Sequence, residues 1–107
     1  GTPRREFLYV DDMADACIFA MKRYSGAGIL NIGTGTDIAI AEFARLVAEV
    51  VGYPGRIAFD TTRPDGTPRK LVDTARMTAL GWRAGTRLES GLALAYASFL
   101  RGERAER

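Results

Sequence analysis

The sequence predicts a small α/β fold in which about four helices are interleaved with three or four short strands. Two patterns support this prediction. In several segments apolar residues recur at every third or fourth position, which is typical of one face of an amphipathic helix. Between these segments lie short runs rich in branched and aromatic residues, which favour strands. A chain of 107 residues that is 47% hydrophobic is long enough for one domain, and we assign residues 1–107 to it.

The first strand and helix are predicted near the amino terminus. Residues 6–10 have the composition of a strand, and Asp11 or Asp12 can cap the helix that follows. The single cysteine falls within the apolar pattern of this helix, so we expect a buried thiol without a catalytic role. The residues expected in the core are Met13, Cys17, Ala20, Met21 and Tyr24.

A second strand and helix follow the same plan. Residues 29–32 are predicted as a strand and residues 33–37 as a turn. The next helix is expected to end at Gly52, because glycine readily adopts the conformation that terminates helices. Its expected buried face consists of Ile40, Phe43, Ala44, Val47 and Val51.

The second half contains one further predicted strand and two helices. Residues 56–60 are predicted as a strand, and residues 61–69, with two prolines and a glycine, as a surface loop. Asp73 can cap a short helix that ends at Gly81. A capping box at residues 86–89 then predicts the last helix, and residues 102–107 are expected to be a disordered tail. The expected buried stripe of this helix is Leu88, Leu92, Ala95, Tyr96 and Phe99.

Composition excludes several classes of function. The chain has no histidine and one cysteine, so we predict no metal site and no catalytic triad. A net charge of +2 is too weak to indicate a nucleic-acid partner. No apolar run approaches the roughly 20 residues that cross a bilayer, and no signal peptide is recognisable, so we expect no membrane association and a cytoplasmic location.

The turn Gly33-Thr34-Gly35 lies where dinucleotide-binding folds place a glycine-rich loop, but Ile38 stands in place of the third glycine. Short-chain reductases pair a tyrosine with a lysine four residues later, and none of the four tyrosines has such a partner. We therefore predict no cofactor-binding and no catalytic residues within this chain.

A group of charged residues is the strongest candidate for a binding site. An arginine can hold two phosphate oxygens at once, and a nearby aspartate can accept hydrogen bonds from sugar hydroxyls or a base. If the fold brings the group together, it faces an anion such as a nucleoside diphosphate. The alternative is that these are solvated charges on a mobile loop. The group comprises Arg4, Arg5, Arg63, Asp65, Arg69 and Lys70.

Three segments resemble a known family. Residues 1–14 and 31–35 look like the carboxy-terminal region of extended short-chain reductases that act on nucleotide sugars. The segment 64–71, Pro-Asp-Gly-Thr-Pro-Arg-Lys-Leu, is similar to the GDP-L-fucose synthases within that family. The resemblance covers residues 1 to about 100. One departure is Ala39, where the family usually has a hydroxyl that caps the next helix.

The resemblance implies that this chain is a carboxy-terminal substrate-binding domain that lacks the Rossmann domain. In the family, the Rossmann domain binds NADP and carries the catalytic residues, so we expect this chain to be inactive alone and to bind no cofactor. Arg5 is implied to contact the nucleotide diphosphate, and Asp65 and Lys70 to bind the nucleotide portion of a GDP-sugar. The intact parent would be an NADP-dependent GDP-4-keto-6-deoxy-mannose 3,5-epimerase and 4-reductase.

Two other functions remain open. The chain could be part of an epimerase or dehydratase for a different nucleotide sugar, although the segment 64–70 argues against this. It could instead be a free-standing module that binds an anion or a partner protein. The expected partners are a GDP-sugar and the missing Rossmann domain, and a homo-oligomer is a further possibility.

Overall fold

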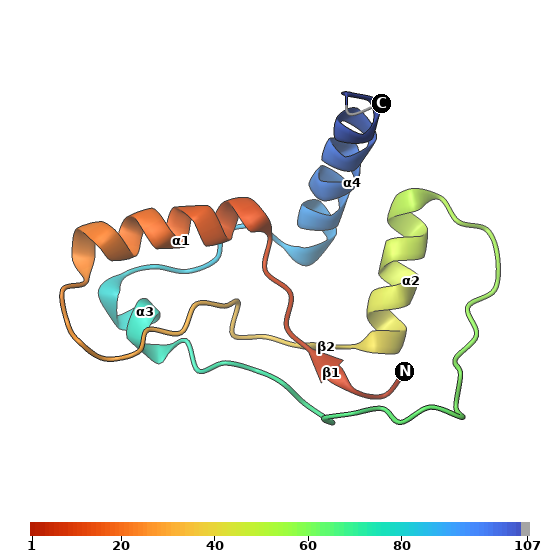
Figure 1. Ribbon diagram of the computed structural model, residues 1–107, viewed down its shortest axis with the longest axis horizontal. Helices are drawn as coiled ribbons and strands as arrows, with labels where there is room; N and C mark the ends of the chain where they lie inside the picture. Colours follow the sequence, from red (N-terminus) through yellow and green to blue (C-terminus); the bar gives the residue numbers. More distant parts are fainter. Residues whose placement is uncertain (106–107) are drawn as a thin grey trace.

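The computed structural model describes residues 1–105 as four helices and two short strands (Figure 1). The α/β class and the four helices are confirmed, whereas two strands replace the three or four that were predicted. The elements are β1 (Arg4–Arg5), α1 (Val10–Arg23), β2 (Ile38–Ala39), α2 (Ile40–Val51), α3 (Ala75–Leu80) and α4 (Leu88–Ala105).

The strands do not lie where sequence composition placed them. Strands β1 and β2 pair antiparallel, with Arg4 opposite Ala39 and Arg5 opposite Ile38. The predicted strands at 6–10, 29–32 and 56–60 are not strands, and α1 already begins at the end of the first. Composition favours an extended backbone, but a strand also needs a hydrogen-bonded neighbour. Within residues 1–105, these three segments have none.

Helix α1 begins close to the predicted position, but the predicted core face is correct only in part, since Ala20 and Tyr24 are half-buried whereas the other three residues are exposed. Met13 and Met21 are 39% and 78% exposed, and Cys17 is exposed rather than buried. The face turned inward carries Ala16, which is fully buried, and Phe19. Periodicity identifies an apolar face, but it does not reveal which face other elements cover.

Polar groups on the inward side of α1 fasten it to the segment before α4. Asp12 does not cap its own helix but accepts hydrogen bonds from the amide and the hydroxyl of Thr86, both at 3.0 Å. Asp15 accepts one from Nε1 of Trp82 at 3.0 Å. Helix α4 begins at Leu88, so Thr86 does not occupy the N-cap position, and the predicted capping box of Thr86 with Glu89 is wrong.

Helix α2 begins without a side-chain cap, because its N-cap residue is Ala39. The first amides of the helix are satisfied by the amino-terminal segment instead. The amide of Ile40 donates to the carbonyl of Pro3, and that of Ala41 to the carbonyl of Gly1, each at 2.9 Å. The helix ends as predicted at Gly52, which has a left-handed φ of 74°.

Helices α3 and α4 complete the fold. Asp73 accepts a hydrogen bond from the amide of Ala75 at the start of α3, as predicted, and Gly81 ends the helix with a φ of 106°. Helix α4 contacts α2 (Figure 1). The predicted stripe of α4 is partly correct, since Leu88, Leu92 and Tyr96 are half-buried whereas Ala95 and Phe99 are exposed. Residues 102–105, predicted as part of a disordered tail, belong to α4, and residues 106–107 lie outside the described part.

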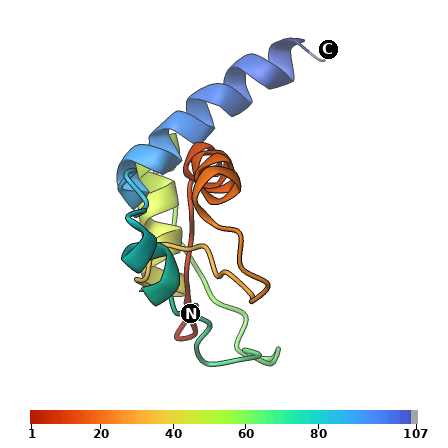
Figure 2. The same cartoon turned by 90° about the vertical axis from the view of Figure 1, so that its left-hand side faces the viewer.

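The molecule is open, with a small core. Among the residues whose burial is described, only Ala16, Met77 and Trp82 form the buried apolar core. The radius of gyration is 16.5 Å, against about 13 Å for a compact domain of this length. Figure 2 shows α4 extending away from the rest, and Figure 1 shows the wide excursion of the chain between α2 and α3. No helix in residues 1–105 has the length and hydropathy to span a membrane.

Candidate functional site

The carboxylate of Asp37 joins two arginines that are far apart in the sequence. Nε of Arg4 lies 2.9 Å from Oδ1 of Asp37, and Nε of Arg69 lies 2.5 Å from Oδ2. The Asp37 side chain is only 5% exposed, whereas the two arginine side chains are 44% and 61% exposed. We call these three residues the Asp37 clasp. The clasp attaches the loop before α3 to the β1–β2 ribbon.

The clasp lowers the pKa of Asp37. Burial raises the pKa of the carboxyl, but hydrogen bonds and positive charge from Arg4 and Arg69 lower it by more. The net pKa therefore lies below the ordinary value of 3.8. Asp37 is consequently a carboxylate at neutral pH and opposes two positive charges.

Backbone hydrogen bonds add the loop to the ribbon as a third extended segment. The amide of Arg4 donates to the carbonyl of Pro68 at 2.9 Å, and the amide of Lys70 donates to the carbonyl of Arg4 at 3.2 Å. Arg4 and Arg69 thus form a parallel bridge. Because side chains alternate along extended backbone, we expect Arg5 and Lys70, each one residue after a bridge partner, to face away from the Asp37 clasp.

Arg5 also reaches the loop that carries Asp65. Its Nη1 donates to the carbonyl of Arg4 at 2.7 Å. A β-carbon built on Gly66 would lie 4.0 Å from Nη2 of Arg5, so the guanidinium is close to this turn. Gly66 has a φ of 78°, a conformation that glycine adopts without strain. The structure therefore brings Arg5 beside the turn next to Asp65.

Glu6, the residue after β1, holds two further segments in place. Its Oε2 accepts hydrogen bonds from the amide of Gly35 at 2.7 Å and from the hydroxyl of Thr34 at 3.2 Å. Its Oε1 accepts one from the amide of Val72 at 3.2 Å. The turn at residues 33–35 is thus a packed junction around a carboxylate, as expected for an ordinary tight turn.

The predicted charged group is divided by this geometry. Arg4 and Arg69 are engaged by Asp37, and Arg63 pairs with Asp60 at 3.2 Å in an exposed part of the loop. Three of the four arginines in the group therefore face carboxylates rather than a common anion. Arg5 and Lys70 are the remaining cations of the group.

Sequence reasoning did not assign a site role to Asp37 or Glu6. Local spacing suggests for Asp37 only a substitute cap for α2, because its arginine partners lie 33 and 32 positions away. The partner amide of Glu6 on Val72 is 66 positions away. No local spacing pattern reveals such contacts.

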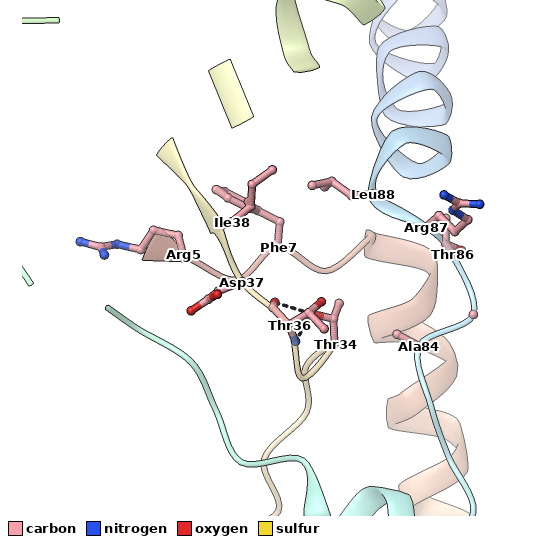
Figure 3. A pocket seen from close by; sticks show the side chains of 11 residues that line it. Arg5, Phe7, Thr34, Thr36, Asp37, Ile38, Ala84, Thr86, Arg87 and Leu88 are labelled. Atoms are coloured by element: carbon pink, nitrogen blue, oxygen red, sulfur yellow. Dashed lines mark hydrogen bonds between the residues drawn. The ribbon is translucent and has the colours of Figure 1, made fainter. Parts of the chain in front are cut away.

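A cavity of about 250 Å³ lies beside the ribbon, between the turn at 33–37 and the start of α4 (Figure 3). Arg5 and Arg87 lie at opposite ends of it in Figure 3, so they do not converge on one group there. The hydroxyls of Thr34 and Thr86 are already hydrogen-bonded within the chain. The face with Arg5 and Lys70 is therefore the stronger candidate for holding a diphosphate.

Comparison with known proteins shows that the chain is similar to nucleotide-sugar enzymes. Residues 1–33 match the NAD dependent epimerase/dehydratase family. The chain is 51% identical over 100 residues to putative GDP-L-fucose synthase 2 of Arabidopsis thaliana, and 52% identical over 100 residues to GDP-L-fucose synthase of Sinorhizobium fredii. It is 47% identical over 112 residues to GDP-L-fucose synthase of Escherichia coli K12. The chain is homologous to the GDP-L-fucose synthases.

The homology covers almost all of this chain but only part of the GDP-L-fucose synthases. The three matches take in 94%, 94% and 96% of the chain, and 30%, 32% and 35% of the relatives. The chain therefore spans about a third of the length of the GDP-L-fucose synthases that it matches.

Solved structures of related enzymes have the same arrangement of elements. A GDP-L-fucose synthetase from Naegleria fowleri bound to NADP superimposes with a TM-score of 0.90 at 23% identity, over 97% of this chain and 33% of that chain, which supports the fold. A GDP-6-OMe-4-keto-L-xylo-heptose reductase from C. jejuni gives a TM-score of 0.86 at 34% identity, over 94% and 32% of the two chains. The arrangement in Figure 1 is thus a recurrent part of GDP-L-fucose synthases and related reductases.

Proposed function

We propose that the chain is the nucleotide-sugar-binding portion of a GDP-L-fucose synthase-like, NADP-dependent epimerase and reductase, and that it is not catalytic alone. The observation that carries the proposal is the parallel bridge between Arg4 and Arg69. Together with the alternation of side chains along extended backbone, this bridge supports a position of Arg5 and Lys70 on one side of a three-segment ribbon, and Arg5 is close to the turn beside Asp65.

The chemistry of this face suits a nucleoside diphosphate. The Arg5 guanidinium can donate two parallel hydrogen bonds to phosphate oxygens, and the Lys70 ammonium adds a compact positive charge. Asp65, on the exposed loop beside Gly66, can accept hydrogen bonds from the nucleoside. The remaining two thirds of the parent protein would bind NADP and supply the catalytic groups. The reaction would be the 3,5-epimerisation and 4-reduction of GDP-4-keto-6-deoxy-mannose.

A second candidate is another reductase or epimerase of nucleotide sugars. It is supported by the C. jejuni GDP-6-OMe-4-keto-L-xylo-heptose reductase at 34% identity and by a GDP-D-glycero-L-gluco-heptose synthase of the same organism at 32% identity. A UDP-glucose 4-epimerase of Thermotoga maritima, with a TM-score of 0.85 at 28% identity, also supports it. Identity to several GDP-L-fucose synthases is higher, at 47% to 52%, so these remain the preferred assignment.

The proposal is tested by placing the full chain in an active relative. The matching segment of the Escherichia coli enzyme is replaced by this chain, since the match covers 96% of the chain and 35% of that enzyme. We expect the chimera to convert its GDP-sugar. Arg5→Ala or Lys70→Ala should then raise KM about 10- to 150-fold, with a smaller change in kcat, because each loses a charge-assisted hydrogen bond worth about 1.5 to 3 kcal/mol.

Asp60→Asn is the matched control, because Asp60 forms an exposed ion pair with Arg63 on the same loop. It should leave KM within about twofold of the unsubstituted chimera. An inactive chimera, or unchanged KM values in both the Arg5 and the Lys70 variants, contradicts the proposed function. A preference for UDP-sugars would favour the second candidate.

A further inference from the structure

We propose that Asp37 is a positioning residue for ligand binding: by holding Arg4 and Arg69 on one face of the ribbon, it directs Arg5 and Lys70 to the other. The inference rests on the proposed function of Arg5 and Lys70. In this role Asp37 acts through the two arginines that it binds, not through the nucleotide.

The argument begins with the loop that carries Lys70. Residues 53–74 contain no helix and no strand, only the isolated bridge at Arg69. Near the ribbon, the loop is attached by the two backbone hydrogen bonds of Arg4, by the Glu6–Val72 contact and by the ion pair between Arg69 and Asp37. The backbone hydrogen bonds set the register of the loop on β1, and the ion pair with Asp37 is the side-chain contact that secures Arg69 in this register.

Because side chains alternate along extended backbone, fixing the side on which Arg69 lies also fixes the side on which its neighbours lie. Shifting an extended segment by one residue moves every side chain to the opposite side. With Arg69 bound to Asp37, its neighbour Lys70 must lie on the far side, and Arg4 imposes the same rule on Arg5. Backbone pairing defines this register, and Asp37 is the buried side-chain partner that holds both arginines in it.

The electrostatic effect of Asp37 has the opposite sign, which makes the two roles separable. Replacing Asp37 by Asn removes a negative charge and leaves two arginines uncompensated. The surroundings become more positive, so a pure field effect would strengthen binding of an anionic diphosphate. Loss of positioning would weaken it instead. The direction of the change in KM therefore distinguishes the two.

The experiment uses the chimera that contains the full chain. Asp37→Asn should raise KM for the GDP-sugar about tenfold and change kcat less than threefold, because the diphosphate is held equally in the ground state and in the transition state. In a Lys70→Ala background, the same substitution should raise KM by less than about threefold, because the group that it positions is already gone.

Arg69→Gln provides a second variant, which removes one arm of the clasp but keeps the buried carboxylate paired with Arg4. It should raise KM in the same direction, and Asp60→Asn should not. The inference is overturned if Asp37→Asn lowers KM or leaves it unchanged while Lys70→Ala raises it. It is also overturned if the effects of the two substitutions on KM simply multiply. Failure of Lys70→Ala itself to raise KM would instead count against the proposed function.

Should Asp37→Asn prevent the chimera from folding, Arg69→Gln and the cycle of Arg69→Gln with Lys70→Ala decide the question by the same criteria.

Discussion

Asp37 offers a pH dependence that belongs to one residue. Its pKa in the folded chain lies below the ordinary value of 3.8, so its contribution to stability is fully present above that value and is lost as the pH falls through the lower, folded pKa. We expect the thermal midpoint of the unsubstituted chain to exceed that of Asp37→Asn by a constant margin at pH values well above 3.8, and the margin to vanish only in stronger acid. Thermal unfolding followed by circular dichroism over this range measures it. A margin that disappears between neutral pH and 3.8 would contradict the clasp.

At the same scale, sequence and structure give different kinds of information about the site. Arg5, Asp65 and Lys70 are implied by motifs that a reader can find in the sequence, and their roles stay predictions. Asp37 and Glu6 are identifiable only in three dimensions, because carboxylates and guanidinium groups interact over distances that depend on folding rather than on spacing. The cations of a binding face can thus be proposed from sequence, but the groups that aim them cannot.

At the scale of the element, α2 shows a helix start that can be improved. Ala39 leaves the N-cap position without a side-chain acceptor, although Glu42 stands at the third helical position, where a capping box requires Glu or Gln. Ala39→Ser should therefore raise the free energy of unfolding by about 0.5 to 1 kcal/mol. The gain is no larger because the amides of Ile40 and Ala41 already donate to backbone carbonyls. Denaturant unfolding of the chain is the measurement.

Ala93→Ser is the control for this prediction, because Ala93 is exposed within α4 and offers no cap. It should cost a few tenths of a kcal/mol, in line with the lower helix propensity of serine. Equal effects of the two substitutions would mean that the start of α2 gains nothing from a hydroxyl.

The four helices were predictable because their periodicity and stop signals are local. The three strands misplaced by sequence analysis depended instead on pairing partners that lie elsewhere in the chain.

At the scale of the whole molecule, the small core makes two methionines behave very differently. Met77 is 1% exposed and belongs to the three-residue core, whereas Met21 on α1 is 78% exposed. Met77→Ala should lower the free energy of unfolding by about 2 to 5 kcal/mol, which is a large share of the stability of so open a chain. Met21→Ala should change it by less than about 0.5 kcal/mol. Chemical denaturation of the two variants tests this, and comparable losses would refute the described packing.

The exposed apolar side chains have the same origin as the errors in core prediction. Val10, Ile18 and Met21 on α1 are 68%, 50% and 78% exposed. A helical apolar stripe is a sound prediction of a surface that something covers, and the chain matches only about a third of the length of its relatives. Sequence periodicity identifies an apolar helix face, but it does not reveal whether residues of this chain cover that face.

The amino-terminal hexapeptide meets the rest of the chain at widely separated points. Its residues bond to the start of α2, to the loop at 68–70, to the turn at 33–35 and to Val72. During synthesis on the ribosome, the first six residues therefore emerge long before their final neighbours exist. Residue 72 must leave the exit tunnel before residues 1–6 can form all of these contacts. The order of translation therefore makes assembly of the Arg5–Lys70 face a late event, limited by closure of a long loop.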